Sequence, residues 1–252
     1  MKRHIPNIVT LANLFCGSLA AIVLLQAGNV IIAIWLVILA ATFDFFDGFL
    51  ARILKVSGEM GKQLDSLADM ITFGLVPGLI AYEIMHAMQI AQPGGWWQGW
   101  NYVPLVIVLF SALRLARFNI DARQSDQFIG VPTPANTLAW LGLPYFFFSS
   151  DELAVLHDLP EPSSISTQWW WVIPVLAVIG ASLMVAPMPM LALKFKHAGW
   201  KGNEARWLLI VLSVTVLIGG FFVFGNPFQA LPIVLLLYLV ISAISNAVPS
   251  GK

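Results

Sequence analysis

Charged residues are scarce in this chain of 252 residues. Lys, Arg, Asp and Glu together make up 10% of it, whereas hydrophobic residues make up 59% and the mean hydropathy is +0.83. Soluble globular proteins carry about 25% charged residues, so this composition excludes that class and predicts a polytopic membrane protein. The 13 basic and 13 acidic residues cancel, so there is no basic surface that would predict binding to nucleic acid.

Cysteine is nearly absent as well. The single Cys16 excludes an internal disulfide and a metal site built from cysteines. The four histidines, His4, His86, His157 and His197, fall in separate segments without the spacing of metal ligands. We therefore interpret them as helix-end or loop residues.

Long apolar stretches dominate the rest of the chain. Eight of them approach the roughly 20 residues that a membrane-spanning helix needs. They fall at about residues 8–27, 30–53, 64–86, 102–119, 132–149, 169–189, 205–224 and 229–247. The pattern predicts an all-α polytopic membrane bundle of about eight transmembrane helices.

The basic residues are distributed unevenly between the connections. If the N-terminus is cytoplasmic, all 13 Lys and Arg residues fall in cytoplasmic segments, and the longest outer loop, around residues 150–168, is acidic. Because positive residues remain on the cytoplasmic side of membranes, this segregation predicts that both termini are cytoplasmic.

Four aspartates interrupt the apolar sequence near the cytoplasmic end of two of these helices. Asp44 and Asp47 share one helix face, and Asp65 and Asp69, four residues apart, share a face of the next helix. Residues 55–62 are predicted to form a short polar turn, which would make the two helices an antiparallel hairpin.

These carboxylates would repel one another strongly unless cations lay among them. Hard divalent ions with oxygen ligands, Mg²⁺ or Mn²⁺, suit such a cluster, and two of them could bind a diphosphate. Gly48 and Ala51 on the same acidic face leave room for a flat or bulky group against the helix. The alternatives from the residues alone are a set of helix-terminal acids and a cation pathway through a transporter.

The acidic stretch resembles the signature of a known enzyme family. The pattern D-x2-D-G-x2-A-R-x8-G-x3-D-x3-D is similar to that of the CDP-alcohol phosphatidyltransferases, and this chain matches it in full at Asp44, Asp47, Gly48, Ala51, Arg52, Gly61, Asp65 and Asp69. Eight fixed positions at fixed spacing are far more specific than one acidic pair.

The resemblance implies a site and a reaction. Two divalent cations, Mg²⁺ or Mn²⁺, would bind Asp44, Asp47, Asp65 and Asp69, and Asp69 would also act as the catalytic base. The nucleotide of a CDP-activated lipid would be bound by Asn7, Thr10, Gly48, Ala51, Arg52 and Gly61, where Asn7 and Thr10 have the alternative role of helix caps. The family further implies a single transmembrane domain over residues 1–252, with a catalytic core at about 7–150 and C-terminal helices at about 169–247.

Two further stretches, LRLARFN and FIGVPTPA, resemble those of the branch of the family that uses L-serine. They contribute Arg114, Arg117, Gly130 and Pro132 to a predicted pocket for the lipid phosphate or for the carboxylate of serine. The alternative for the arginines is that they extend to the membrane interface without binding substrate.

The predicted activity is thus metal-dependent transfer of a phosphatidyl group from CDP-diacylglycerol to L-serine, giving phosphatidylserine and CMP. The resemblance also implies a homodimer in the cell (inner) membrane with its active site facing the cytoplasm. Sister enzymes that use glycerol 3-phosphate or inositol phosphate share the acidic signature and form the main alternative. A transporter and an intramembrane prenyltransferase are less favoured, and the phospholipase D-like serine transferases are disfavoured because the chain has no H-x-K-x4-D motif.

Overall fold

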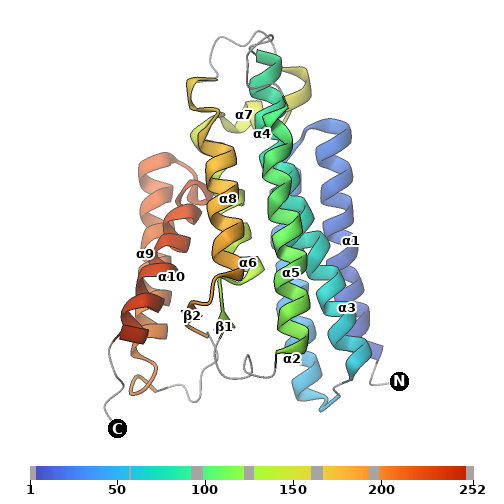
Figure 1. Ribbon diagram of the computed structural model, residues 1–252, viewed down its shortest axis with the longest axis vertical. Coiled ribbons are helices and arrows are strands. Elements are labelled where there is room, and N and C mark those ends of the chain that lie inside the picture. The colour runs from blue at the N-terminus through green and yellow to red at the C-terminus, as the bar shows by residue number, and fades with distance from the viewer. Residues whose placement is uncertain are drawn as a thin grey trace.

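The computed structural model describes residues 4–56, 58–91, 99–121, 128–159, 167–192 and 199–247, and nearly all of its regular structure is helical. The longer helices run roughly parallel to one another in a bundle (Figure 1). They are α1 (His4–Ala27), α2 (Val30–Ile53), α3 (Glu59–Asp69), α4 (Val76–Ala91), α5 (Val106–Ile120), α6 (Thr133–Gly142), α8 (Val172–Val185), α9 (Glu204–Phe224) and α10 (Leu231–Ala247).

Short elements connect these helices. They are the π-helix η1 (Met70–Leu75), the helix α7 (Ser150–Leu153) and the 3₁₀ turns η2 (Trp100–Leu105), η4 (Leu143–Phe146), η5 (Leu156–Asp158), η6 (Thr167–Trp169) and η7 (Pro227–Ala230). The strands β1 (Phe128–Ile129) and β2 (Pro189–Met190) form a two-residue antiparallel pair. The predicted all-α class is confirmed.

Six helices of the described chain are long and apolar enough to cross a membrane, so this is a membrane protein. The two other predicted spans are shorter. The predicted span 132–149 is divided at Gly142 into α6 and η4, and α8 has 14 residues, which is about 21 Å against a hydrocarbon core of about 30 Å.

The helices α6 and α8 nevertheless run in opposite directions along the bundle (Figure 1). In Figure 1, α6 leads from β1 up toward α7, α8 returns to β2, and both chain ends lie at the same end of the molecule. This arrangement agrees with an even number of passes, and the count of eight membrane crossings stays a prediction.

The polar turn between the two acidic helices is shorter than predicted. The helix α2 ends at Ile53 and α3 already begins at Glu59, so Gly61 and Lys62 are helical. Gly58 is the extended N-cap residue, and an acidic residue in the first turn, Glu59, is favoured there by the positive end of the helix dipole.

The helix α3 continues through η1 into α4 as one helical segment, Glu59–Ala91. The π-helix has a local cause. Pro77 has no N–H to donate to the Phe73 carbonyl four residues earlier. Just before it, the Val76 N–H donates to the Ile71 carbonyl, five residues earlier, which is the π-helical pattern. The hydroxyl of Thr137 donates to the freed Phe73 carbonyl at 3.0 Å, so this buried acceptor is not left unpaired.

The helix α1 holds the two acidic helices in place, since it packs against α2, α3 and η1. Its buried Asn13 accepts a hydrogen bond from the Thr72 hydroxyl at 2.7 Å. Gly17 lies directly beside that hydroxyl, because a Cβ at residue 17 would come within 2.3 Å of it. The contact between α1 and η1 therefore requires glycine at this position.

This close contact predicts that Gly17→Ala destabilises the protein by about 1–3 kcal/mol, because the added methyl group must displace Thr72 and its bond to Asn13. The free energy of unfolding of the purified protein in detergent, with heat or denaturant as the perturbant, measures the effect. Gly219→Ala is the matched control, since a Cβ there meets no atom within 4 Å and alanine favours a helix. Equal stability of the two variants would contradict the prediction.

Candidate active site

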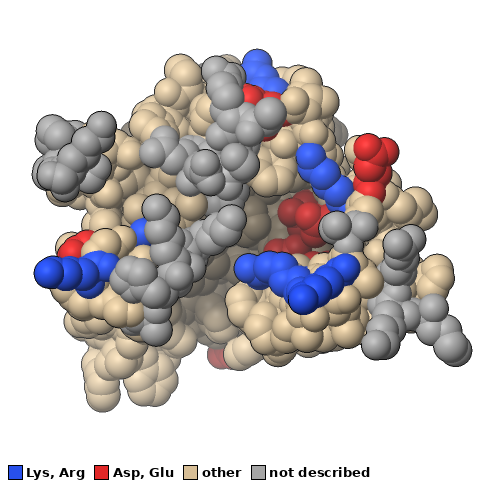
Figure 2. Space-filling model, turned by 90° about the horizontal axis from the view of Figure 1, so that it is seen from below, with Lys and Arg blue, Asp and Glu red and all other residues tan. Residues whose placement is uncertain are grey.

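A cavity of about 770 Å³ opens at the end of the bundle where the chain begins and ends. Seen from that end, Lys and Arg side chains stand around a hollow in which acidic side chains lie (Figure 2). Residues of α1, α2, α3, α5 and the start of α6 line this cavity. The cavity is large enough for a nucleotide-sized ligand.

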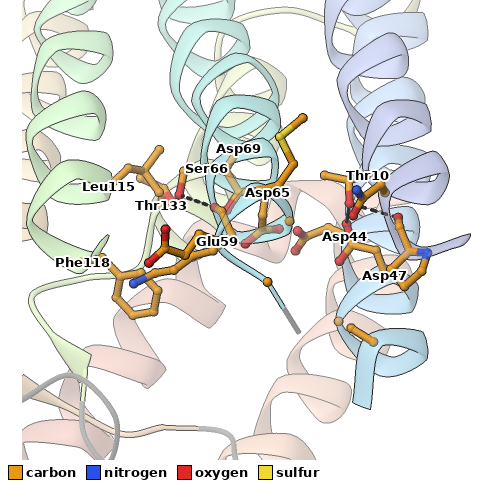
Figure 3. Close-up of a pocket in the computed structure, with 18 of the residues that line it drawn as sticks. Thr10, Asp44, Asp47, Glu59, Asp65, Ser66, Asp69, Leu115, Phe118 and Thr133 are labelled. Carbon is orange, nitrogen blue, oxygen red and sulfur yellow. Dashed lines mark hydrogen bonds between the residues drawn. The ribbon is translucent and has the colours of Figure 1, made fainter. Parts of the chain in front are cut away.

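The four predicted aspartates all line the cavity. Asp44 on α2 and Asp65 on α3 point toward each other across it (Figure 3). Asp44, Asp47 and Asp65 each offer a carboxylate oxygen within 4.8 Å of the others. Asp44 also lies within hydrogen-bonding distance of Asp69. The predicted convergence of the two acidic helix faces is confirmed.

Buried Asp47 is fixed by a neighbour from a third helix. Its Oδ2 accepts a hydrogen bond from the Thr10 hydroxyl of α1, which also donates to the Pro6 carbonyl at 3.1 Å. In the described part of the chain, no Lys or Arg forms an ion pair with any of the four carboxylates. Anions this close in apolar surroundings need a cation or shared protons, and an oxygen-only set suits a hard divalent metal ion.

Small residues form one wall of the cavity. Gly48 and Ala51 of α2 line it together with Gly61 of α3. A Cβ at Gly48 would meet its nearest atom only at 4.0 Å, and a Cβ at Gly61 would lie 3.4 Å from Oδ1 of Asn7. This wall can therefore contact a flat ligand along its backbone, with Asn7 beside it.

Three buried polar atoms in the cavity have no hydrogen-bond partner among the described residues. They are Oδ1 of Asp69, Nε of Arg114 and Oγ1 of Thr133, which come from three different helices. Leaving such a group unpaired costs about 1–3 kcal/mol. An acceptor, a donor and a hydroxyl in one cavity indicate a polar ligand with groups of both kinds.

Three of the predicted site residues lie outside the cavity lining. Arg52 donates from Nε to the Gly48 carbonyl at 2.9 Å, and Arg117 donates from Nη1 to the Val185 carbonyl at 3.4 Å. Gly130 has φ +77°, and a Cβ there would lie 2.2 Å from the Met184 carbonyl oxygen. In this structure Arg52 bonds within its own helix α2, Arg117 joins α5 to α8, and Gly130 allows a close approach of two backbones.

The remaining predicted residues, Asn7, Thr10, Arg114 and Pro132, do line the cavity. The structure adds a hydrogen-bonded chain that the sequence analysis missed. The ammonium group of Lys62 donates to the Asn119 carbonyl at 2.7 Å, and the Asn119 amide donates to Oγ of Ser66 at 2.8 Å. Lys62 and Ser66 share a helix face with Asp69, and this spacing could have indicated that both lie near the site.

The fold and the site together define a class. This is a helical membrane protein with a carboxylate-lined polar cavity that opens at one end of its bundle. Residues 3–179 match the CDP-alcohol phosphatidyltransferase family. The chain belongs to that family, and the resemblance of its acidic motif is confirmed.

Curated relatives agree with this assignment. The chain is similar to the CDP-diacylglycerol–serine O-phosphatidyltransferase of Helicobacter pylori, with 30% identity over 243 residues, 93% of this chain and 87% of the relative. It is 33% identical over 221 residues to the Mycobacterium bovis protein of the same name, 83% of this chain and 68% of the relative. A Bacillus subtilis protein, also of that name, is 36% identical over 132 residues, 52% of this chain and 70% of the relative.

The contact between Thr10 and Asp47 predicts that Thr10→Val weakens divalent-ion binding by about 10- to 100-fold, because partners of metal-ligating carboxylates contribute that much. Calorimetric titration of the purified protein with Mn²⁺ measures the affinity. Thr215→Val is the matched control, since the exposed Thr215 hydroxyl bonds only to the Val211 carbonyl of its own helix. An unchanged affinity in Thr10→Val would show that this hydrogen bond does not support a metal ligand.

Proposed function

We propose that this protein transfers a phosphatidyl group from CDP-diacylglycerol to L-serine, producing phosphatidylserine and CMP. The observation that carries the proposal is the convergence of Asp44, Asp47, Asp65 and Asp69 in one cavity beside the unpaired polar atoms of Arg114 and Thr133. Membership of the family supports the CDP-activated substrate, and the names of the relatives support serine.

The aspartates would hold two divalent cations, Mg²⁺ or Mn²⁺. Asp44, Asp47 and Asp65 have the convergent oxygens that such ions require, and Asp69 adjoins Asp44. When bound, the ions supply positive charge that stabilises the diphosphate and the leaving CMP. The donor set fits this role because it contains only carboxylate oxygens.

The small-residue wall would receive the nucleotide. Gly48, Ala51 and Gly61 leave the backbone of α2 and α3 accessible, and Asn7 at the edge of the wall can hydrogen-bond to a base or ribose. The outer surface of α2 is apolar, with Phe45 and Phe49 exposed, as expected where acyl chains of a membrane lipid lie beside the site. Both halves of CDP-diacylglycerol would thus have a suitable surface.

Asp69 would act as the general base. Its buried Oδ1 has no hydrogen-bond partner and can accept the proton of the serine hydroxyl as that oxygen attacks phosphorus. A bond forms between the serine oxygen and the phosphorus bonded to diacylglycerol, while the bond from that phosphorus to the oxygen of CMP breaks. The proton goes to Asp69 and the bonding electrons leave with CMP.

Arg114 and Thr133 would bind the amino acid. Arg114 is buried, with the residue 6% exposed, and its Nε is unpaired, so a serine carboxylate would satisfy it with a charge-assisted hydrogen bond. The other cation of the cavity lining, Lys62, is already bonded to Asn119. A single available guanidinium suits a carboxylate better than the dianionic phosphate of glycerol 3-phosphate.

The cavity would face the cytoplasm from the cell (inner) membrane. The segregation of Lys and Arg in the sequence supports this orientation, and several of those that the structure describes lie beside the mouth of the cavity (Figure 2). The predicted homodimer and the predicted catalytic core at about residues 7–150 belong to the same proposal.

The proposal is tested by incubating the purified protein with CDP-diacylglycerol and Mn²⁺ and measuring CMP release. We expect release with L-serine, far less with glycerol 3-phosphate or inositol phosphate, and none after chelation of divalent ions. Release with glycerol 3-phosphate alone would overturn the serine assignment and leave the family assignment intact.

The position of Asp69 predicts that Asp69→Asn lowers kcat by at least about 10²- to 10⁴-fold, because the amide cannot accept the serine proton. Binding of CDP, measured by calorimetry with Mn²⁺ present, should be lowered much less than kcat. Asp121→Asn at the C-cap of α5, outside the cavity lining, is the control for removal of one acid. Near-normal turnover in Asp69→Asn would exclude Asp69 as the base.

A further inference from the structure

A second cluster of metal-ligating side chains lies on the outer half of the bundle. Glu83 and His86 belong to α4, and His157 belongs to η5 in the connection between α7 and α8. Asp69 and Glu83 are 14 residues apart in one helical segment, so the cluster lies about 21 Å along that helix from the aspartate cavity. From the sequence, His86 and His157 are interpreted as helix-end or loop residues without the spacing of metal ligands, and the structure places both beside Glu83.

The three side chains converge on one atom. Oε2 of Glu83 lies 2.9 Å from Nε2 of His157 and 4.0 Å from Nδ1 of His86. In a tetrahedral zinc site with ligands at about 2.0–2.1 Å, the ligand atoms are about 3.3 Å apart. The two observed separations bracket that value, so a small side-chain adjustment would place all three around one ion.

In the part of the chain that the structure describes, no Lys or Arg forms an ion pair with Glu83. The Glu83 side chain is 3% exposed. The chain contains no Lys or Arg between Lys62 and Arg114 or between Arg123 and Lys194, which are the stretches that build this region. A buried carboxylate requires a proton or a cation beside it. Two imidazoles that converge on it are the ligands with which zinc is commonly bound.

Contacts outside the cluster fix both histidines. The His86 ring stacks on Tyr82 at 5.7 Å with an interplanar angle of 8°. The backbone N–H next to His157, that of Leu156, donates to the Gly28 carbonyl, and the His157 ring fills the space that a Cβ of Gly28 would occupy. Gly28 has φ +57°, so the turn between α1 and α2 both needs glycine and makes room for the imidazole.

An ion could reach the cluster from outside. The His86 and His157 side chains are 38% and 28% exposed, and His86 also lines a separate cavity of about 380 Å³ with Tyr82, Gln89 and Asn101. Of the three cluster residues, His86 lines this cavity, which gives water and ions access to its ring. The site thus has three protein ligands, fixed ring orientations and an entry path.

We propose that Glu83, His86 and His157 bind a zinc-class divalent ion on the side of the membrane opposite the aspartate cavity. The ion would join α4 to the connection that contains η5 and so stabilise the outer end of the bundle. The proposal does not depend on the reaction proposed for the aspartate cavity.

The experiment measures Zn²⁺ binding to the full-length protein in detergent, in an Asp65→Asn background that weakens competition from the aspartate cavity. We expect one Zn²⁺ per chain by elemental analysis and a higher Tm when ZnCl₂ is added. His86→Gln and His157→Gln retain a hydrogen-bond donor for Glu83 but lose a strong ligand. Each should lower Zn²⁺ affinity by more than the roughly 10- to 100-fold cost of losing an outer-shell partner.

Gln89→Ala is the matched control, because Gln89 lines the same small cavity and contributes no imidazole. X-ray absorption of the Zn²⁺-loaded background protein provides a measurement that needs no histidine variant, and two imidazole ligands are expected. The proposal is overturned if the background binds no Zn²⁺, if the histidine variants bind it as tightly as the control, or if the spectrum shows oxygen ligands only. The cluster would then be a hydrogen-bonded contact and nothing more.

Discussion

The mutual repulsion of four carboxylates is the constraint on which this structure depends. Asp44, Asp47, Asp65 and Asp69 lie in one cavity of a protein whose surface is otherwise largely apolar. Such a group of anions is stable only with cations or protons among them. The fold must also prevent α2 and α3 from separating, and α1 does so by packing against both and by bonding to Asp47 and η1.

The need for access from two phases explains why the cavity lies at one end of the bundle. A site for a membrane lipid and a polar small molecule must be reached both from the bilayer and from water. The end of the bundle meets both conditions, because apolar side chains of α2 face outward beside a polar opening. Lys and Arg side chains beside that opening give it positive charge, which favours the approach of anionic substrates (Figure 2).

The sequence predicted the parts of this site that follow from local spacing. Asp44 and Asp47, and Asp65 and Asp69, share helix faces by periodicity alone, and a short connection forces those faces together. Arg117 was predicted from the resemblance of the LRLARFN stretch but lies outside the cavity lining, since its direction depends on how α5 packs against α8. Periodicity places a residue on a helix face, and tertiary packing decides what that face meets.

Contacts between distant segments could not be predicted in this way. His157 reaches Glu83 only because the connection containing η5 is bonded to the turn at Gly28, and no local pattern relates these three residues. The sequence did show that histidines are few and widely spaced, which argues against a metal site only when the ligands are assumed to be near one another in the chain. In a bundle of roughly parallel helices (Figure 1), residues at the same depth can become neighbours whatever their separation in the sequence.

The π-helix η1 sets the direction of Glu83 in α4 relative to that of Asp69 in α3. In a regular helix, the 14 residues from Asp69 to Glu83 would turn the side-chain direction about the helix axis by about 1400°. This is about 40° short of four full turns, so the two side chains would lie on nearly the same face. A π turn holds one additional residue and rotates the following helix by about 100°. Pro77 causes this shift by leaving Phe73 without its usual donor. The rotation lets α3 direct its aspartates toward α1 and α2 while α4, the more buried part of the same segment, directs Glu83 toward η5.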